Sequence, residues 1–533
     1  MARARGGARR TLRACLGDKQ SRRHLSRLLA LCATRAALLA LPACPAWAER
    51  WDVVTTLSGG LTHTDNVSLA QDATKQSAWI TQIIPGISIT ATGARVQFNV
   101  NYAPEYIYYD AEGQKGDQVF QRGNANVRAE LAKRVLFVEA GASVNQYDVS
   151  LQGPLTTSNI NTTGNRTTVK TFFLSPYLRH EFGSDARGEA RFTYSDWSSD
   201  SPTVLADNES NRIDLRLASG PAYQRFTWDI VYRRETIQYD ETLQENLTEA
   251  ITENVRWLIT PTVGLLGLVG YERYDSGNLG SVLEGSRWGA GLEWTPTPRT
   301  RLAATAGKRF DENTYSFDFR HRRRLTTWSA NYSEDVTTSR SDFFVPATTS
   351  TAGALDQLFL SQVPDPVARQ KAVEEFIART GLPTSLSAPV NFFSDQLFLA
   401  KKWQASVALQ GVRNTLIANA FTESREVSFG GLILTGTGDF AASNSIRQTG
   451  ASLVWNWRAT ARTAWTLSMV HTRSEFPASN RVDDLTYAQI SLARQLQPRL
   501  TGSLYYRWRQ NDSSQSVSSY TENAAGAILR LKF

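Results

Sequence analysis

The sequence predicts an all-β protein: a transmembrane antiparallel β-barrel of about 22 strands, within a range of 18 to 24. Three observations predict it. The chain ends on a strand that alternates between apolar and polar residues and finishes on an aromatic residue. The same alternation recurs every 20 to 25 residues from Trp51 to Phe533. Short turns also alternate with longer polar connections, which is the arrangement of outer-membrane barrels.

The last strand has one apolar face and one largely polar face. The apolar face carries Ala527, Leu529, Leu531 and Phe533. The other face carries Arg530 and Lys532. Lipid-facing and lumen-facing residues alternate in this way along barrel strands, although the edge strand of a soluble sheet would show the same pattern. We expect Phe533 to act as an assembly signal that the barrel-assembly machinery recognises.

The N-terminal segment predicts a secretory signal peptide over residues 1–48. This segment holds ten Lys and Arg residues against one acid, Asp18. An apolar run at 36–41 and the sequence Ala46-Trp47-Ala48 follow, so cleavage is expected after Ala48. Leu41 to Cys44 offers an alternative lipoprotein acylation site, with a poorly fitting proline. The length of the segment also allows the true start codon to lie after Met1.

Composition excludes several classes of function. The whole chain has 58 basic and 50 acidic residues, whereas residues 49–533 have 48 and 49. The basic excess therefore belongs to the N-terminal segment and gives no argument for nucleic acid binding. All three cysteines, Cys15, Cys32 and Cys44, also lie there. Residues 49–533 can therefore form no disulfide, thiolate metal site or cysteine nucleophile.

Turn signals divide residues 49–533 into strands of a single barrel domain, without a linker. Strands are clearest where Ile213, Leu215 and Leu217 alternate with charged residues. Ten short connections are expected at 92–94, 132–134, 183–187, 220–221, 260–262, 296–298, 322–324, 401–402, 459–461 and 497–498. Ten short turns join twenty strands, and the first and last strands make 22. Tryptophans beside these turns favour an interfacial girdle, with core packing as the alternative: Trp257, Trp294, Trp403, Trp457 and Trp465.

One connection, residues 337–391, is long enough to hold its own secondary structure. Pro364 and Pro366 precede, and Gly381 follows, a segment that predicts a helix over 367–379. Such a loop either caps the outside of the barrel or folds into the lumen as a constriction. The sequence favours neither.

No catalytic, cofactor or metal site is evident, so no enzyme is predicted. The four histidines after residue 48 lie far apart, and no phosphate loop or nucleophile elbow occurs. Asp483 and Asp484 are adjacent and would point to opposite faces of a strand. The expected lumen-facing path is instead a set of mixed charges, compatible with a hydrated polymer path or with ion pairs that stiffen the wall: Arg212, Asp214, Arg216, Asp229, Arg233, Asp318, Arg320, Arg507 and Arg509.

Three short segments carry a resemblance to a known family. They are Thr64 to Leu69, Ile83 to Ile89 and the aromatic strand Tyr102 to Tyr109. Their order resembles the PEP-CTERM system-associated outer-membrane β-barrel proteins. The resemblance implies a porin in the outer membrane of a Gram-negative bacterium, acting as a conduit for exopolysaccharide export.

The resemblance also implies partners: outer-membrane lipid, a polysaccharide substrate and a periplasmic polysaccharide-export protein. A general diffusion porin for small solutes is the alternative function, and an outer-membrane enzyme barrel a weaker one. The sequence does not identify the sugar.

Overall fold

The computed structural model describes most of the chain after the predicted signal peptide. The described residues are 50–110, 117–156, 158–200, 207–240, 245–276, 281–344, 397–427, 438–441 and 444–533, with positions 356, 359, 369, 372 and 373. The predicted signal peptide and its cleavage site lie outside these residues. No helix in this part of the chain is long and apolar enough to span a membrane.

The chain forms 24 strand segments in one sheet. The first twelve are β1 Arg50–Thr64, β2 Ala78–Thr92, β3 Val96–Tyr102, β4 Glu105–Asp110, β5 Gln118–Phe120, β6 Gly123–Ala132, β7 Leu136–Asp148, β8 Arg166–Phe182, β9 Ala186–Ser199, β10 Asn208–Ser219, β11 Phe226–Tyr239 and β12 Glu245–Leu258. The other twelve are β13 Val263–Ser276, β14 Ser281–Thr297, β15 Thr300–Arg309, β16 Glu312–Arg322, β17 Thr326–Thr338, β18 Leu397–Gln410, β19 Asn414–Glu426, β20 Ser445–Thr460, β21 Thr463–Phe476, β22 Arg481–Gln497, β23 Leu500–Ser513 and β24 Tyr520–Lys532. Short helices are α3 Ser339–Phe344, η2 Gly438–Ala441, η3 Pro477–Ser479 and η4 Ser516–Ser518.

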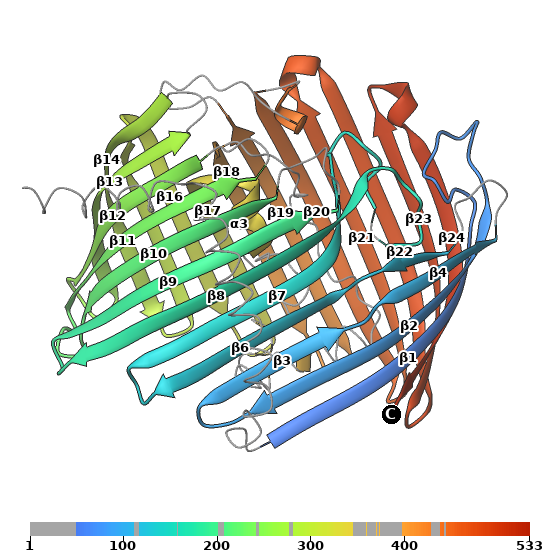
Figure 1. Ribbon diagram of the computed structural model, residues 1–533, viewed down its shortest axis with the longest axis horizontal. Helices are drawn as coiled ribbons and strands as arrows, with labels where there is room; N and C mark the ends of the chain where they lie inside the picture. The colour runs from blue at the N-terminus through green and yellow to red at the C-terminus, as the bar shows by residue number, and fades with distance from the viewer. Residues whose placement is uncertain are drawn as a thin grey trace, which may run out of the picture.

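These segments build a closed barrel of 22 antiparallel strands, which confirms the predicted fold (Figure 1). β2 pairs with both β3 and β4, which are one strand interrupted at Ala103 and Pro104. β6 pairs with β3 and β5 pairs with β4, so β5 and β6 together form the next strand of the wall. The barrel closes through β1 and β24, whose register places Leu57 opposite Leu531.

The outer surface of the barrel is apolar. Leu215 on β10, Leu292 on β14 and Leu529 on β24 are 44%, 55% and 53% exposed, and their neighbours in sequence face inward. Leaving such side chains on the surface is unfavourable in water and favourable against lipid. The alternation that identified the strands therefore also separates the two surfaces of the wall.

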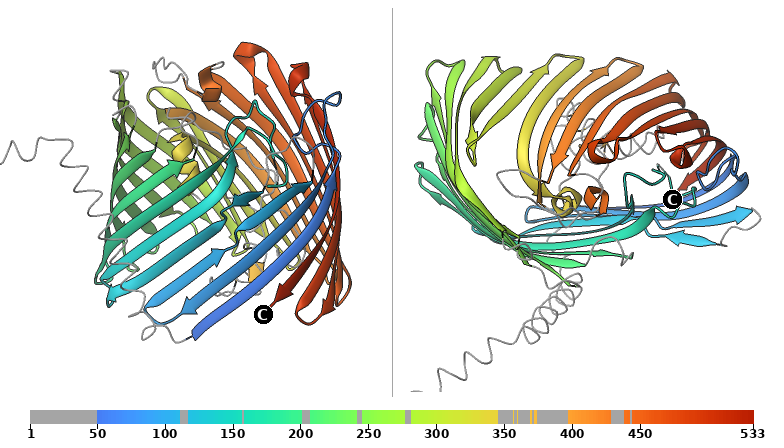
Figure 2. Two further views of the ribbon diagram at one scale, coloured as in Figure 1. Left: turned by 45° about the vertical axis from the view of Figure 1, so that its right-hand side comes forward. Right: turned by 90° about the horizontal axis from the view of Figure 1, so that it is seen from above.

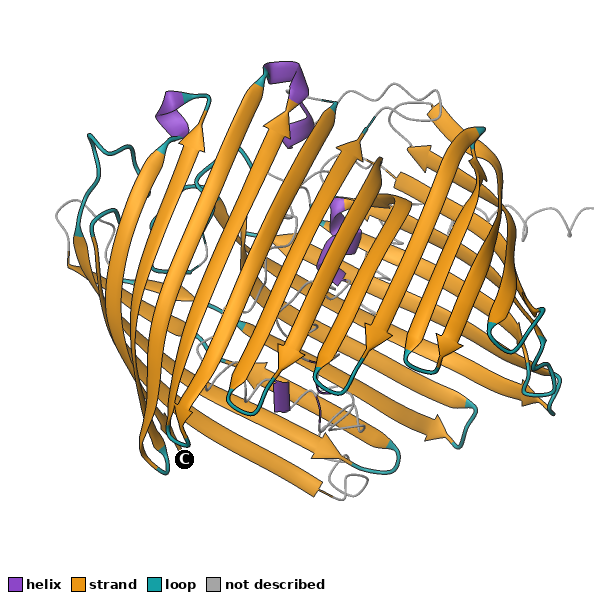
Figure 3. Cartoon of the chain, turned by 180° about the vertical axis from the view of Figure 1, so that it is seen from behind, coloured by secondary structure: helices purple, strands orange, loops and turns teal. Residues whose placement is uncertain are grey.

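Ten short turns of two to six residues lie at one end of the barrel. The long connections lie at the other end, together with a few short ones such as the two-residue turn 310–311 (Figure 3). Nine of the ten turns fall where the sequence predicted them. The turn predicted at Lys401-Lys402 is wrong, because both residues lie inside β18 and Lys401 pairs with Glu426 of β19 at 3.2 Å. The actual turn is 411–413. Two adjacent lysines are typical of a turn, and the partner that places Lys401 in a strand instead is distant in sequence, so the local pattern did not reveal it.

Four of the five girdle tryptophans lie within four residues of a short turn on the outer surface. They are Trp257, Trp294, Trp457 and Trp465, which are 36–54% exposed. This exposure is inconsistent with core packing. Trp403 is also on the outer surface, but it lies in the middle of β18 because the expected neighbouring turn does not exist.

Candidate functional site: the lumen and the segment that crosses it

The lumen wall is lined by charges that are paired between neighbouring strands. Glu272 on β13 is 3.1 Å from Arg287 on β14 and 2.7 Å from Arg309 on β15. Glu293 on β14 lies 2.7 Å from Arg301 on β15 and also pairs with Arg256. Directly opposed side chains on adjacent strands share a face of the sheet. The pairs therefore tie successive strands together from the inside.

The structure places all nine residues of the predicted lumen path on inward-facing positions, and each has an oppositely charged neighbour. Asp214 lies 2.8 Å from both Arg212 and Arg233. The other pairs are Arg216–Asp229 at 3.6 Å, Arg320–Asp318 at 3.2 Å, Arg507–Glu522 at 2.7 Å and Arg509–Glu522 at 4.0 Å. This pairing favours wall stiffening as their first role.

A connection that the sequence did not single out runs through the lumen. Residues 149–165 join β7 to β8, and we call them the crossing segment; all but residue 157 are described. Figure 2, in the view from above, shows it inside the flattened ring of strands. Arg481 on β22 donates to the carbonyl of Gln152 at 2.6 Å. Since β7 and β22 are separated around the wall by six intervening strands, the segment reaches well away from its own strands.

Two apolar anchors hold the ends of the crossing segment. Ile160 is 2% exposed and packs in a cluster with Val67, Ile80 and Ile107. At the other end Leu151, also 2% exposed, packs with Phe398, Phe440 and Phe476. These clusters join β2 and β4 on one side to β18–β21 on the other. Burying one such side chain stabilises by about 1.5–3 kcal/mol, so the segment has a defined seat at each end.

Between the anchors, the segment is held by a buried charged group on β23 and β24. Arg507 donates to Ser158 Oγ at 2.8 Å and to Glu522 Oε1 at 2.7 Å. Asn161 of the segment donates to the same Glu522 oxygen at 2.7 Å. Arg509 donates to the carbonyl of Leu155 at 3.3 Å. Arg507, Arg509 and Glu522 are 2%, 0% and 0% exposed, and buried charges at this depth require such partners.

A second loop supports the segment from the opposite side. In η2, Asp439 accepts a hydrogen bond from the backbone nitrogen of Leu151 at 2.7 Å and another from the Ser150 hydroxyl. Burial raises the pKa of the Asp439 carboxyl, while these two hydrogen bonds and the charges of Arg481 and Arg425 oppose the rise. The contact therefore depends on a carboxyl group whose charge is disfavoured by its surroundings.

The long connection after β17 also enters the lumen at its start. Arg340 of α3 is 3% exposed and donates to Ser195 Oγ on β9 at 2.9 Å. It also lies 3.5 Å from Glu235 on β11. The helix predicted over 367–379 lies mostly outside the described residues; within it Arg369, Ala372 and Val373 are helical. The two alternatives for that helix, a constriction in the lumen or a cap outside the barrel, concern residues outside the described ones.

The described residues offer no metal centre. They contain no group of three His, Cys, Asp or Glu residues able to hold a metal ion. Asp483 and Asp484 point to opposite faces, as expected: Asp483 is buried against Arg481 at 2.8 Å, whereas Asp484 lies 3.6 Å from Arg473.

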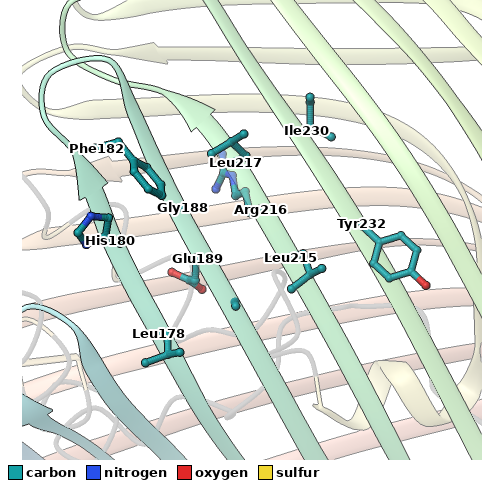
Figure 4. A pocket seen from close by; sticks show the side chains of 11 residues that line it. Leu178, His180, Phe182, Gly188, Glu189, Leu215, Arg216, Leu217, Ile230 and Tyr232 are labelled. Carbon is teal, nitrogen blue, oxygen red and sulfur yellow. The ribbon is translucent and has the colours of Figure 1, made fainter.

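One hollow lies on the outer surface of the barrel. It has a volume of about 360 Å³, and its lining includes Leu178, Phe182, Leu215 and Tyr232 (Figure 4). Leu178 and Phe182 are each 51% exposed. An apolar depression on this surface suits lipid chains and adds nothing to the chemistry of the lumen.

Comparison with known proteins assigns the chain to no family. No family model and no curated protein matches the chain. Among solved structures it is similar to the siderophore receptor PiuA from Acinetobacter baumannii, with 8% identity, 91% of this chain and 82% of that chain covered, and a TM-score of 0.46. It is also similar to the FrpB iron transporter from Neisseria meningitidis, with 9% identity, 93% of this chain and 83% of that chain covered, and a TM-score of 0.47. For OccAB2 of A. baumannii the identity is 9%, the coverage is 90% of this chain and 98% of that chain, and the TM-score is 0.34.

Proposed function

We propose that this protein is a passive outer-membrane conduit for exopolysaccharide export, closed at rest by the crossing segment. The observation that carries the conduit is the separation of surfaces: apolar side chains face outward, and paired charges face a lumen. Such a wall is soluble in lipid on the outside and hydrated on the inside. The crossing segment supplies the closure, since it is anchored on distant strands inside the ring.

The family resemblance supports a polysaccharide as the substrate of this conduit. One of the motifs that carry the resemblance also contacts the crossing segment. Asn66, from the Thr64–Leu69 motif, is fully buried and donates to the carbonyls of Ala70 at 2.7 Å and Thr521 at 2.8 Å. The carbonyl of Val67 accepts a hydrogen bond from Thr162 of the crossing segment at 2.9 Å. The motif therefore fixes the seat of the closure. This connects the residues that suggest an exporter with those that would control it.

Deletion of the gene in its host, together with recordings from the purified protein, tests the proposal. The deletion strain should lose surface polysaccharide and retain the synthesis machinery, with polymer or lipid-linked precursor accumulating in the envelope. In planar bilayers the wild-type channel should conduct little, and shortening the crossing segment should raise its conductance. A wild-type channel that conducts small ions freely, in a strain with normal surface polysaccharide, would identify a general diffusion porin instead.

A further inference from the structure

The two ends of the barrel carry opposite charge, although residues 49–533 are almost neutral overall. The ten short turns contain nine arginines and one lysine, Lys133, against a single carboxylate, Asp185. The described part of the connections at the opposite end contains ten acidic residues against three basic ones, Lys75, Arg340 and Arg369. Short turns face the periplasm in outer-membrane barrels. The basic end is therefore the entrance for anything that leaves the cell.

The turn cations are available to a ligand. All ten are exposed, and none forms an ion pair within the described residues. They are also distributed widely around the barrel: eight of the ten turns carry at least one, including Arg323 and Arg324 before β17, Arg413 before β19 and Arg462 before β21. The short-turn end thus presents a ring of unneutralised positive charge, which we call the basic rim.

Phosphates of the inner-leaflet lipids are the simplest alternative ligand for such a rim. Charged residues on the inner surface of the barrel at this end argue that lipid binding does not account for all of the positive charge. Five cations lie within two residues of this end on inward-facing positions, where lipid does not reach: Arg187, Arg322, Arg458, Arg530 and Lys532. Three acids share this inner zone, Asp52, Glu130 and Glu181. The positive charge of the turns therefore continues into the lumen in reduced form and is not confined to the lipid boundary.

We infer that the basic rim is a capture site for an anionic polymer, so that the polysaccharide this conduit exports is a polyanion; this inference rests on the proposed function. Charge of one sign around a mouth raises the local concentration and entry rate of the opposite charge. Conduction also requires that a substrate binds well enough to enter and weakly enough to leave. A basic entrance with an acidic exit meets both requirements and disfavours re-entry of the released chain.

Blockade of current by added polymers tests this inference in the full barrel with its crossing segment shortened, because the wild-type channel should conduct little. Polyglutamate and a neutral dextran of similar length are added to either side of a planar bilayer at 0.15 M salt. A Val412→Cys variant, changed at a turn position that is 89% exposed, identifies the short-turn side by modification with an impermeant thiol reagent. Polyglutamate should block about tenfold more often from the short-turn side than from the other, and raising the salt to 1 M should remove most of the difference.

The charge-removal variant is Arg323→Gln/Arg324→Gln/Arg413→Gln/Arg462→Gln, and Asp200→Asn/Asp207→Asn at the opposite end is its matched control. The first variant should lose about tenfold in polyglutamate blockade and keep its dextran blockade, while the control should lose neither. The salt dependence of blockade in the barrel with the shortened crossing segment provides the same test without the arginine substitutions, should that variant fail to assemble.

Three results would overturn the inference. Equal blockade by dextran and polyglutamate would leave a polymer conduit without charge preference. Unchanged blockade by the arginine variant, with weaker insertion into phosphatidylglycerol vesicles, would make the rim a lipid anchor. Entry of neither polymer into a channel whose crossing segment has been shortened would reject the polymer conduit itself.

Discussion

Glu522→Gln should open the channel, because Glu522 is the shared acceptor beneath the crossing segment. Its Oε1 accepts hydrogen bonds from Arg507 and Asn161 at 2.7 Å and from Thr64 at 3.0 Å. Arg509 lies 4.0 Å away. The substitution keeps the size of the side chain but leaves two buried arginines without a carboxylate. Removing one partner of a buried ion pair costs about 3–5 kcal/mol.

This cost falls on the closed state, in which the crossing segment covers the arginines; once the segment leaves, water can solvate them. Because the amide oxygen still accepts a hydrogen bond, we take the lower value, about 3 kcal/mol. Each 1.4 kcal/mol changes an equilibrium tenfold, so the ratio of open to closed channels should rise about 100-fold. Single-channel recording in planar bilayers measures this ratio as the fraction of time at the highest conductance.

The matched control is Asp318→Asn, which removes a carboxylate from Arg301 and Arg320. Those arginines are 46% and 65% exposed and do not contact the crossing segment. Exposed pairs contribute at most about 1 kcal/mol, so neither conductance nor stability should change appreciably. A Glu522→Gln channel with the open fraction of the wild type would refute the assignment of the crossing segment as the closure.

Three further predictions concern the wall, the last strand and pH. Leu215→Arg should reduce the heat-modifiable barrel seen on gels, because an outward charge costs about 2–4 kcal/mol at the bilayer midplane; Asp214→Asn should be tolerated, and equal damage would mean that the faces are assigned wrongly. Removal of Phe533 should lower the amount of folded barrel, and normal levels would leave this residue a packing role only. Burial raises the pKa of Asp439 in the folded state although its hydrogen bonds from Ser150 and Leu151 lower it, so the net contribution of this carboxyl to the closed barrel should be largest below the usual carboxyl pKa and should fall as pH rises through the raised value. Channel opening should therefore increase with pH across that interval, and Asp439→Asn should abolish the change.

Most of the wall could be predicted from sequence because the information is local. Strand alternation and turn residues lie within a few positions of one another, so the strand number and nine turns followed directly. The one wrong turn, at Lys401-Lys402, arose where an ion pair with Glu426 replaced local turn chemistry. The same limit explains Trp403, whose place in the girdle depended on that turn.

The closure could not be predicted in the same way. Residues 149–165 show no periodicity and contain no charged side chain. Their partners Arg481, Arg507 and Glu522 are 329 to 361 positions away in sequence. The segment at 367–379 drew attention instead because proline and glycine mark a helix locally. Only the Thr64–Leu69 motif pointed toward the closure, and its contact through Val67 is visible only once the barrel is formed.

The way in which the crossing segment is held suggests how a polyanion would open it. Arg481 and Arg509 donate to carbonyl oxygens of the segment, and Arg507 donates to the Ser158 hydroxyl. All three acceptors are neutral. An anionic polymer drawn in from the basic rim offers the same guanidinium groups charged acceptors, and such hydrogen bonds are roughly twice as strong. We therefore expect a polyanion to compete with the segment for these arginines, whereas a neutral polymer has no comparable advantage. In this arrangement the substrate itself displaces the closure, and no separate opening signal is required.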